Sequence, residues 1–178
     1  MPRLDTRPGL ERLGSRILPS ASPVAAHSAP VLNGPSVLQT NPPLAGHGHG
    51  SYSYDAVQSG AGIEYRMSGT AALSGMGAVS VSGSIHSVGF IVRGHAGGEL
   101  TFKGPHGSIT VELIGPTQTG FSPPPTSFTA RVVAETGAYA GRQWHDGRLT
   151  LNLTPAPTAA GAPPRGAFTI AMNLPPAR

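Results

Sequence analysis

The stretch from Leu100 to Leu113, LTFKGPHGSITVEL, indicates the fold class. Apolar and polar residues alternate in two runs, and the tetrapeptide GPHG at 104–107 separates them. The apolar positions are Leu100, Phe102, Ile109, Val111 and Leu113. Such alternation is typical of strands with one buried face, and glycine and proline between two such runs are typical of a hairpin. The sequence therefore predicts an antiparallel hairpin here.

The same alternation recurs on both sides of this hairpin. It involves Ile63, Tyr65 and Met67; Val79, Val81 and Ile85; Val88, Phe90 and Val92; Phe128, Ala130, Val132 and Ala134; Leu149, Leu151 and Leu153; and Phe168, Ile170, Met172 and Leu174. Seven or eight strands follow, and no helical period suits the crossovers of a parallel sheet. We therefore predict an all-β domain over residues 63–178. It is a small antiparallel barrel of about eight strands, which removes exposed strand edges, or a two-sheet sandwich.

Two local features refine this prediction. The apolar phase shifts by one residue between Ile85 and Val88, which predicts a bulge or bend near Ser87. The stretches 115–127, GPTQTGFSPPPTS, and 154–166, TPAPTAAGAPPRG, are rich in proline. Because proline donates no hydrogen bond, we predict that both are long surface loops.

The composition favours an exported β-protein. Glycine (25) and proline (19) make up about a quarter of the 178 residues, and charged residues only 11%. Serine, threonine and glycine must then supply most of the polar surface, which argues against a cytosolic helical enzyme. The chain has no cysteine, so disulfides, zinc-thiolate sites, iron–sulfur clusters and thiol nucleophiles are excluded.

The charge pattern gives no sign of a nucleic-acid partner. The formal net charge is +4, but the basic residues of the second half are scattered singly and form no patch. No apolar run approaches the 18 or so residues of a membrane-spanning helix. We expect neither nucleic-acid binding nor a transmembrane segment.

The segment 21–62 is predicted to be a disordered linker, because serine, proline, alanine and glycine dominate it and no period persists. Within it, His47 and His49 have metal-ligand character, since two imidazoles in flexible backbone can reach one cation. The polar residues that follow them are Tyr52, Tyr54 and Asp55. Two histidines are too few for structural zinc, so we expect a solvated linker with no metal site and no cofactor.

The first twenty residues, MPRLDTRPGLERLGSRILPS, contain four arginines and apolar residues at helical spacing. They predict a short amphipathic helix bounded by Pro8 and Pro19. The relevant positions are Arg7, Pro8, Leu10, Glu11, Leu13, Arg16, Leu18, Pro19 and Ser20. This pattern resembles the LEPR-XLL type N-terminal motif of exported and surface proteins of planctomycete-type bacteria, although Gly14 and Ser15 replace its usual acidic pair. The resemblance implies export; the alternative is an incidental helix or one docked on the domain.

A second resemblance lies in residues 135–141, ETGAYAG, followed by Gly147 and the run Leu149 to Leu153. The segment resembles a glycine-rich motif of allene oxide cyclase and dirigent-type eight-stranded barrels. The resemblance implies barrel architecture, a turn with positive φ at Thr136-Gly137, and an aromatic residue that plugs the barrel end. Glu135 stands where those proteins usually have glycine, and no catalytic residue is carried over.

The candidate ligand site is the polar and aromatic cluster that follows, because ligand contacts concentrate on loops. Its members are Tyr139, Arg142, Trp144, His145 and Asp146. The alternative is a plain hairpin connection with an aromatic cap. No serine-hydrolase elbow occurs, and the carboxylates fall mostly on phases opposite to the apolar residues. The sequence offers no catalytic residues.

We therefore expect an exported, extracellular or cell-surface protein of bacterial type, with a leader over residues 1–20 and a non-catalytic β-domain that binds or adheres. Its ligand would be a small molecule or a glycan. The alternative is a small-molecule barrel enzyme or ligand carrier, similar to the allene oxide cyclase and dirigent-type proteins, with a cavity inside the barrel.

Overall fold

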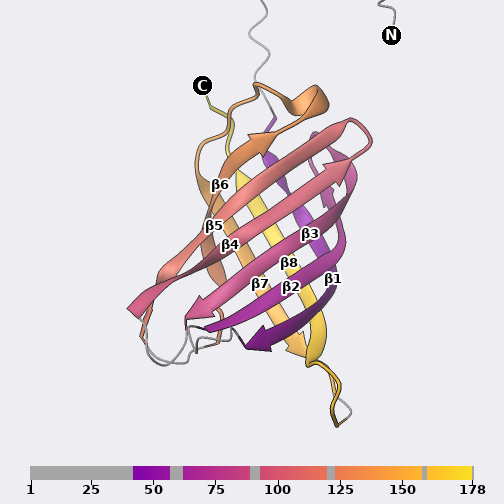
Figure 1. The fold of residues 1–178 in the computed structure, drawn as a ribbon. Helices are drawn as coiled ribbons and strands as arrows, with labels where there is room; N and C mark the ends of the chain where they lie inside the picture. Colours follow the sequence, from indigo (N-terminus) through magenta and orange to yellow (C-terminus); the bar gives the residue numbers. More distant parts are fainter. Residues whose placement is uncertain (1–41, 57–61, 89–92, 120–122, 158–159, 178) are drawn as a thin grey trace, which may run out of the picture. The chain divides into compact units, whose positions relative to one another are not determined.

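The computed structural model describes residues 42–56, 62–88, 93–119, 123–157 and 160–177, and the predicted leader lies outside them. Eight antiparallel strands close into a barrel, each paired with its neighbours in the sequence (Figure 1). They are β1 (Leu44–Ala56), β2 (Gly62–Leu73), β3 (Gly77–Val88), β4 (Arg93–Gly104), β5 (Gly107–Thr119), β6 (Ser127–Glu135), β7 (Gly147–Pro155) and β8 (Arg165–Leu174), with a short 3-10 helix, η1 (Gly137–Tyr139), between β6 and β7. The all-β prediction is confirmed, and the arrangement is a barrel.

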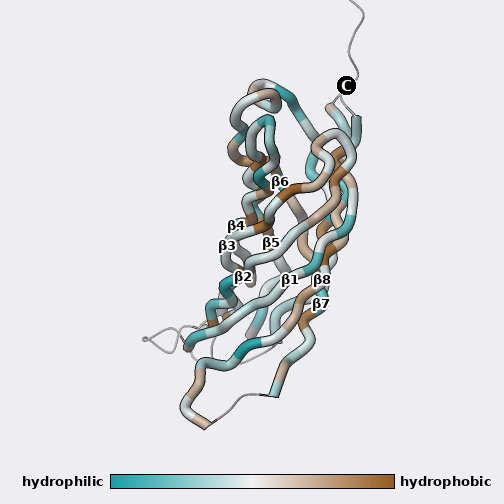
Figure 2. Tube along the Cα trace, turned by 90° about the vertical axis from the view of Figure 1, so that its right-hand side faces the viewer, coloured by the Kyte–Doolittle hydropathy of each residue, from teal (hydrophilic) through white to brown (hydrophobic). Residues whose placement is uncertain are grey.

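The barrel interior is filled by the apolar residues whose alternation predicted the strands. The largest fully buried side chains include Phe102, Phe128, Phe168, Ile85, Leu100, Ile109, Leu113, Leu149 and Leu151. Hydrophobic and hydrophilic residues alternate along the strands accordingly (Figure 2). No helix among the described residues is long and apolar enough to cross a membrane. Most core side chains point inward from the single closed sheet, and Met76 and Tyr139 join them from its connections.

The linker prediction is wrong for residues 44–56, which form β1. This strand pairs with β2 on one side and with β8 on the other, where the ladder runs from Leu44 opposite Leu174 to Ser53 opposite Arg165. The β1–β8 ladder closes the barrel. The strand therefore belongs to the domain, which begins well before residue 63.

Glycines on the inner face of β1 explain why its sequence resembles a linker. A Cβ atom at Gly48 would lie 3.0 Å from Cγ1 of Ile170, and one at Gly50 would lie 2.7 Å from Cε1 of Phe168. Atoms of β2 are closer still, with the oxygen of Thr70 at 2.8 Å from a Cβ atom at Gly48 and that of Ser68 overlapping one at Gly50. Side chains of β8 and the backbone of β2 therefore occupy the space that side chains of β1 would need. The strand alternates glycine inside with histidine or serine outside, and this pattern carries no hydrophobic period.

The predicted hairpin at residues 100–113 is confirmed. The strands β4 and β5 are joined through Pro105 and His106, and Gly104 pairs with Gly107. On the outer face, the hydroxyls of Thr101 and Thr110 lie 3.0 Å apart in a cross-strand hydrogen bond. Local alternation and turn chemistry sufficed here because both strands are adjacent in the sequence.

The predicted bulge or bend near Ser87 does not appear in the β2–β3 ladder, and residues 89–92, which follow β3, lie outside the described residues. The β2–β3 register is continuous to Val88, and Ser87 itself points inward with 1% of its surface exposed. The register shifts lie instead between His95 and Gly97 and between Thr110 and Val111. The prediction failed because Ser87 is polar but continues the inward phase of Ile85. Val88, on the opposite phase, is buried as well, and this made the apolar pattern look shifted.

The two proline-rich stretches behave differently. The first was predicted to be a loop, but β5 continues through Gly115 and Pro116 to Thr119. Its pairing with β4 reaches that end, whereas its pairing with β6 stops at Ile114 opposite Thr129. Proline is tolerated there because no partner strand requires its hydrogen-bond donor. In the second stretch, residues 156–157 and 160–164 lie between β7 and β8, as predicted.

Two truncations test the position of the domain boundary. Deleting residues 1–60 removes β1 and opens the barrel, so the variant should lose its cooperative thermal unfolding transition. Deleting residues 1–37 spares the compact unit that begins at Leu38 and should leave the transition in place. Circular dichroism and the fluorescence of Trp144, the single tryptophan, would follow both variants. Cooperative unfolding of the chain without β1 would contradict the assignment.

Candidate functional site

The predicted positive φ at the Thr136-Gly137 turn is present, and Tyr139 is buried beside it. Gly137 has a φ of +63°, and a Cβ atom there would overlap the carbonyl oxygen of His106 in the β4–β5 turn. The amide of Ala138 donates to this same oxygen at 2.8 Å, which places η1 against the turn at the upper end of the barrel in Figure 1. Tyr139 is only 3% exposed and belongs to the core. An aromatic ring therefore closes this end of the barrel.

The loop that follows η1 contacts the residues just before β1 and those just after β8. The indole nitrogen of Trp144 donates to the carbonyl oxygen of Pro42 at 3.3 Å, just before β1. Trp144 also forms an isolated bridge with Pro176, beyond β8, and the amide of His145 donates to the oxygen of Pro175 at 2.9 Å. The half-buried Trp144 ring packs against the core. These contacts give the loop a structural role.

An exposed ion pair holds the end of the same loop. The guanidinium of Arg131 donates to both carboxylate oxygens of Asp146, with the shortest distance 2.9 Å from its terminal nitrogen. This hydrogen bonding lowers the pKa of Asp146 and raises the pKa of Arg131. Both groups are exposed, so water and salt weaken the pair.

The structure therefore assigns different surroundings to the five predicted site residues. Tyr139 is buried, and the guanidinium carbon of Arg142 lies 5.4 Å from its ring centre, a cation–π contact. Asp146 is paired with Arg131, Trp144 is half-buried, and His145 is exposed. The residues share a loop and do not line any of the hollows described below. Ligand binding by this loop stays a prediction.

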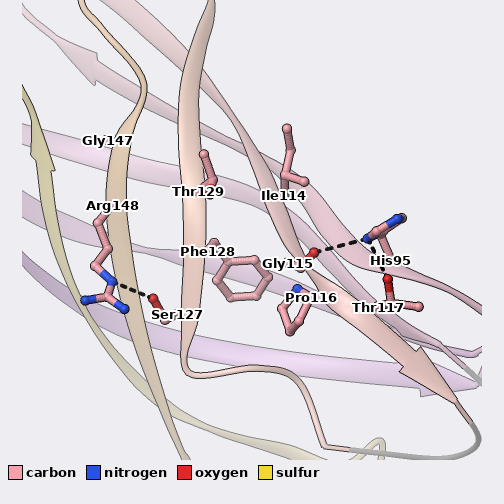
Figure 3. Close-up of a pocket in the computed structure, with 10 residues that line it drawn as sticks. All are labelled: His95, Ile114, Gly115, Pro116, Thr117, Ser127, Phe128, Thr129, Gly147 and Arg148. Atoms are coloured by element: carbon pink, nitrogen blue, oxygen red, sulfur yellow. Dashed lines mark hydrogen bonds between the residues drawn. The ribbon is translucent and has the colours of Figure 1, made fainter.

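A hollow on the outer surface lies where β5 and β6 separate. None of the residues that line it was among the five predicted site residues. It encloses about 530 Å³. Figure 3 shows Arg148 and Ser127 on one side, His95 and Thr117 on the other, and the Phe128 ring between them. The remaining lining residues are Ile114, Gly115, Pro116, Thr129 and Gly147.

The local sequence explains why the sheet opens here. Pro116 has no amide hydrogen, and the β5–β6 ladder ends two residues earlier. A Cβ atom at Gly115 would lie only 3.1 Å from the Phe128 ring, so a side chain at this position would crowd the floor of the hollow. In the sequence, the dipeptide Gly115-Pro116 inside an otherwise alternating run could have indicated that the sheet opens here. The proline-rich context led instead to the loop prediction.

Polar groups on the two flanks are held in place by hydrogen bonds. Nε of Arg148 donates to the hydroxyl of Ser127 at 2.8 Å. Across the hollow, Nδ1 of His95 lies 3.4 Å from both the oxygen of Gly115 and the hydroxyl of Thr117. Among the described residues, no carboxylate lies within ion-pair distance of Arg148. Its terminal nitrogens are thus available to a ligand, and guanidinium groups bind carboxylates, sulfates and phosphates well.

A tyrosine cluster occupies the interior near the opposite end of the barrel. The ring centres of Tyr54 and Tyr65 are 5.4 Å apart, and those of Tyr52 and Tyr65 are 5.9 Å apart. Burial raises the pKa of Tyr52 and of Tyr65. The buried hydroxyl of Ser87 opposes the shift at Tyr65, although it completes no hydrogen bond of standard geometry. This end of the interior is the more polar one.

The described residues contain no group of three or more histidine, aspartate or glutamate side chains placed to hold a metal ion. Comparison with known proteins adds no functional assignment: no family model matches the chain, and no curated protein or solved structure is significantly similar to it.

Replacing Gly137 by valine should destabilise the barrel more than replacing Gly141 by valine. Both glycines have positive φ, which costs a β-branched residue about 1 to 3 kcal/mol, but only Gly137 also faces the backbone of the β4–β5 turn. His145→Ala, at an exposed side chain, should change the free energy of unfolding by about 0.5 kcal/mol or less. Urea unfolding measures all three. A neutral Gly137→Val, or a larger loss in His145→Ala, would contradict this description of the turn.

The ion pair of Asp146 should contribute to acid sensitivity. Because its folded pKa is lowered, its contribution is present above the unfolded-state pKa and is lost as the pH falls through the folded pKa. Asp146→Asn should therefore flatten the acid limb of the stability profile, slightly, because the pair is exposed. Urea unfolding between pH 6 and pH 2 measures this. Superimposable profiles for Asp146→Asn and the parent chain would rule the contribution out.

Proposed function

We propose that this chain is an exported, extracellular or cell-surface, non-catalytic β-barrel whose outer surface binds a polar ligand. The observation that carries this proposal is the filling of the interior. Phenylalanine, leucine, isoleucine and valine side chains occupy it, and they are almost fully buried. A small-molecule or glycan ligand therefore has to bind on the outer surface of the barrel, where the polar side chains lie.

The hollow beside Arg148 is the part of the outer surface best suited to this role. It combines the Arg148 guanidinium, which has no carboxylate partner among the described residues, with the hydroxyls of Ser127, Thr129 and Thr117. The exposed side chain of Ile114 and the pyrrolidine of Pro116 provide apolar contact beside them. A hydroxylated ligand with an anionic group would suit this hollow, because it could contact the guanidinium, the hydroxyls and the apolar side chains together. An acidic glycan fragment has this chemistry.

Export is supported by the first twenty residues and by the composition. The amphipathic, arginine-rich segment resembles an export-type motif, and serines occupy outward positions of β3 at Ser80, Ser82 and Ser84. The absence of cysteine leaves the fold independent of the redox state of its compartment.

The alternative function is a small-molecule enzyme or carrier that holds its ligand inside the barrel. The tyrosine cluster favours it, because three phenol rings and the Ser87 hydroxyl gather at one end of the interior. The core residues beyond this end are packed apolar side chains. An interior ligand would have to displace them, which makes this alternative the weaker one.

Binding of acidic oligosaccharides tests the proposed site. Arg148→Gln should weaken binding about tenfold or more, because it removes a charge-assisted interaction. Lys103→Gln, the same loss of charge on the outer face of β4, should leave binding within about twofold. Glycan-array screening followed by calorimetry gives both affinities. Equal losses in the two variants would mean nonspecific attraction by net charge, and binding that needs Tyr65 but not Arg148 would favour the interior alternative.

Localisation tests export. The native protein should be found outside the cytoplasm, and a chain that lacks residues 1–20 should remain inside the cell. Detecting the intact protein only in the cytoplasm would remove the export part of the proposal. The location of the ligand-binding hollow does not depend on that outcome.

A further inference from the structure

Two histidines on β1 face outward from the same side of the strand. His47 and His49 are both exposed, and the glycine between them points into the barrel. Residues two apart on a strand lie on one face with Cα atoms about 6.6 Å apart. The strand is paired on both sides, with β2 and with β8, so the backbone between the imidazoles is held by two ladders. The pair is therefore preorganised, which a linker could not achieve.

The space above the two imidazoles is open. Both histidines line a hollow of about 370 Å³ over β1, β8 and β7, and its opposite wall carries Thr150 and Asn152. The strand between these walls, β8, presents only the small residues Thr169 and Ala171 outward at this point. Hydroxyl and amide oxygens thus face the histidines across a hollow of two strand spacings, about 10 Å. This width holds a hydrated ion between the two walls.

We propose that His47 and His49 chelate one divalent first-row transition-metal ion on the outer face of the barrel. Imidazole suits zinc, copper and nickel, and among them the affinity of a nitrogen site is highest for Cu²⁺. Two protein ligands leave further coordination positions to water, which Thr150 and Asn152 can bind from the opposite wall. The ion is exchangeable, because the site is open to solvent. Neither histidine lines the hollow beside Ser127 and Phe128, but His47 and Arg148 both line an adjoining hollow over β1, β8 and β7.

Copper titration of the full chain tests the site. Calorimetry should give one tight equivalent of Cu²⁺, and electron paramagnetic resonance should show two nitrogen ligands. His47→Ala and His49→Ala should each weaken binding about tenfold or more. His27→Ala, His106→Ala and His145→Ala should leave the tight equivalent unchanged, since the latter two side chains are exposed elsewhere on the barrel and His27 precedes the described residues.

A spacing variant separates chelation from the mere presence of two histidines. In the double variant His49→Ala, Ser51→His, both imidazoles remain on the outer face of β1, but their Cα atoms are about 13 Å apart and cannot share an ion. Its affinity should equal that of His49→Ala alone, and Cu²⁺ should raise the thermal midpoint of the parent chain but not of this variant. Circular dichroism of the metal-free variants verifies that they fold.

Tight binding that survives in the His47→Ala, His49→Ala double variant would overturn the proposal, as would an equal affinity of the spacing variant and the parent chain. Failure of the parent chain to bind one equivalent would overturn it as well.

Discussion

The pairing of β1 with β8 is the constraint on which the rest of the structure depends. Without it, the sheet would have two open edges and an interior exposed along one side, and edges of this kind are prone to pair with other chains. The ladder from Leu44 to Ser53 removes both edges. The glycines of β1 leave room for the side chains of Ile170 and Phe168 on β8, and also for the neighbouring backbone of β2, which a Cβ atom at Gly50 would approach even more closely. The loop with Trp144 then fastens the segments that enter and leave this pair.

The strands that could be predicted from the sequence are those whose inward residues are apolar. Alternation at Leu100 to Leu113 or at Phe168 to Leu174 is a local signal, and it identified strands between residue 63 and the C-terminus. Of the predicted run at Val88, Phe90 and Val92, the last two residues lie outside the described part of the chain. The first strand could not be found in this way, because its inward positions from Gly46 to Gly50 are glycines and its stability comes from partners far along the chain. Pro116 was misleading for a related reason: proline excludes pairing on one side only, and β5 is paired with β4 on the other.

The candidate sites follow the same division. The cluster after η1 was recognised because its polar and aromatic residues are adjacent in the sequence. Its contacts with Pro42, Pro175 and Arg131 give it a structural role. The hollow beside Arg148 joins residues from four strands and depends on where the β5–β6 ladder ends, which no local pattern specifies. His47 and His49 were visible as a pair, but only a strand gives them a common face. In each case the sequence showed which residue types were present, but their arrangement in space depends on the closed sheet.

Hydrogen exchange of the backbone amides of β1 tests the central claim, that this glycine-rich segment is a structural strand of the barrel. Residues between Gly46 and Tyr52 should exchange with protection close to that of the β4–β5 hairpin, because opening the β1–β8 ladder opens the whole sheet. Exchange of the β1 amides at the rate of an unstructured peptide, while the hairpin amides remain protected, would contradict barrel closure by this segment.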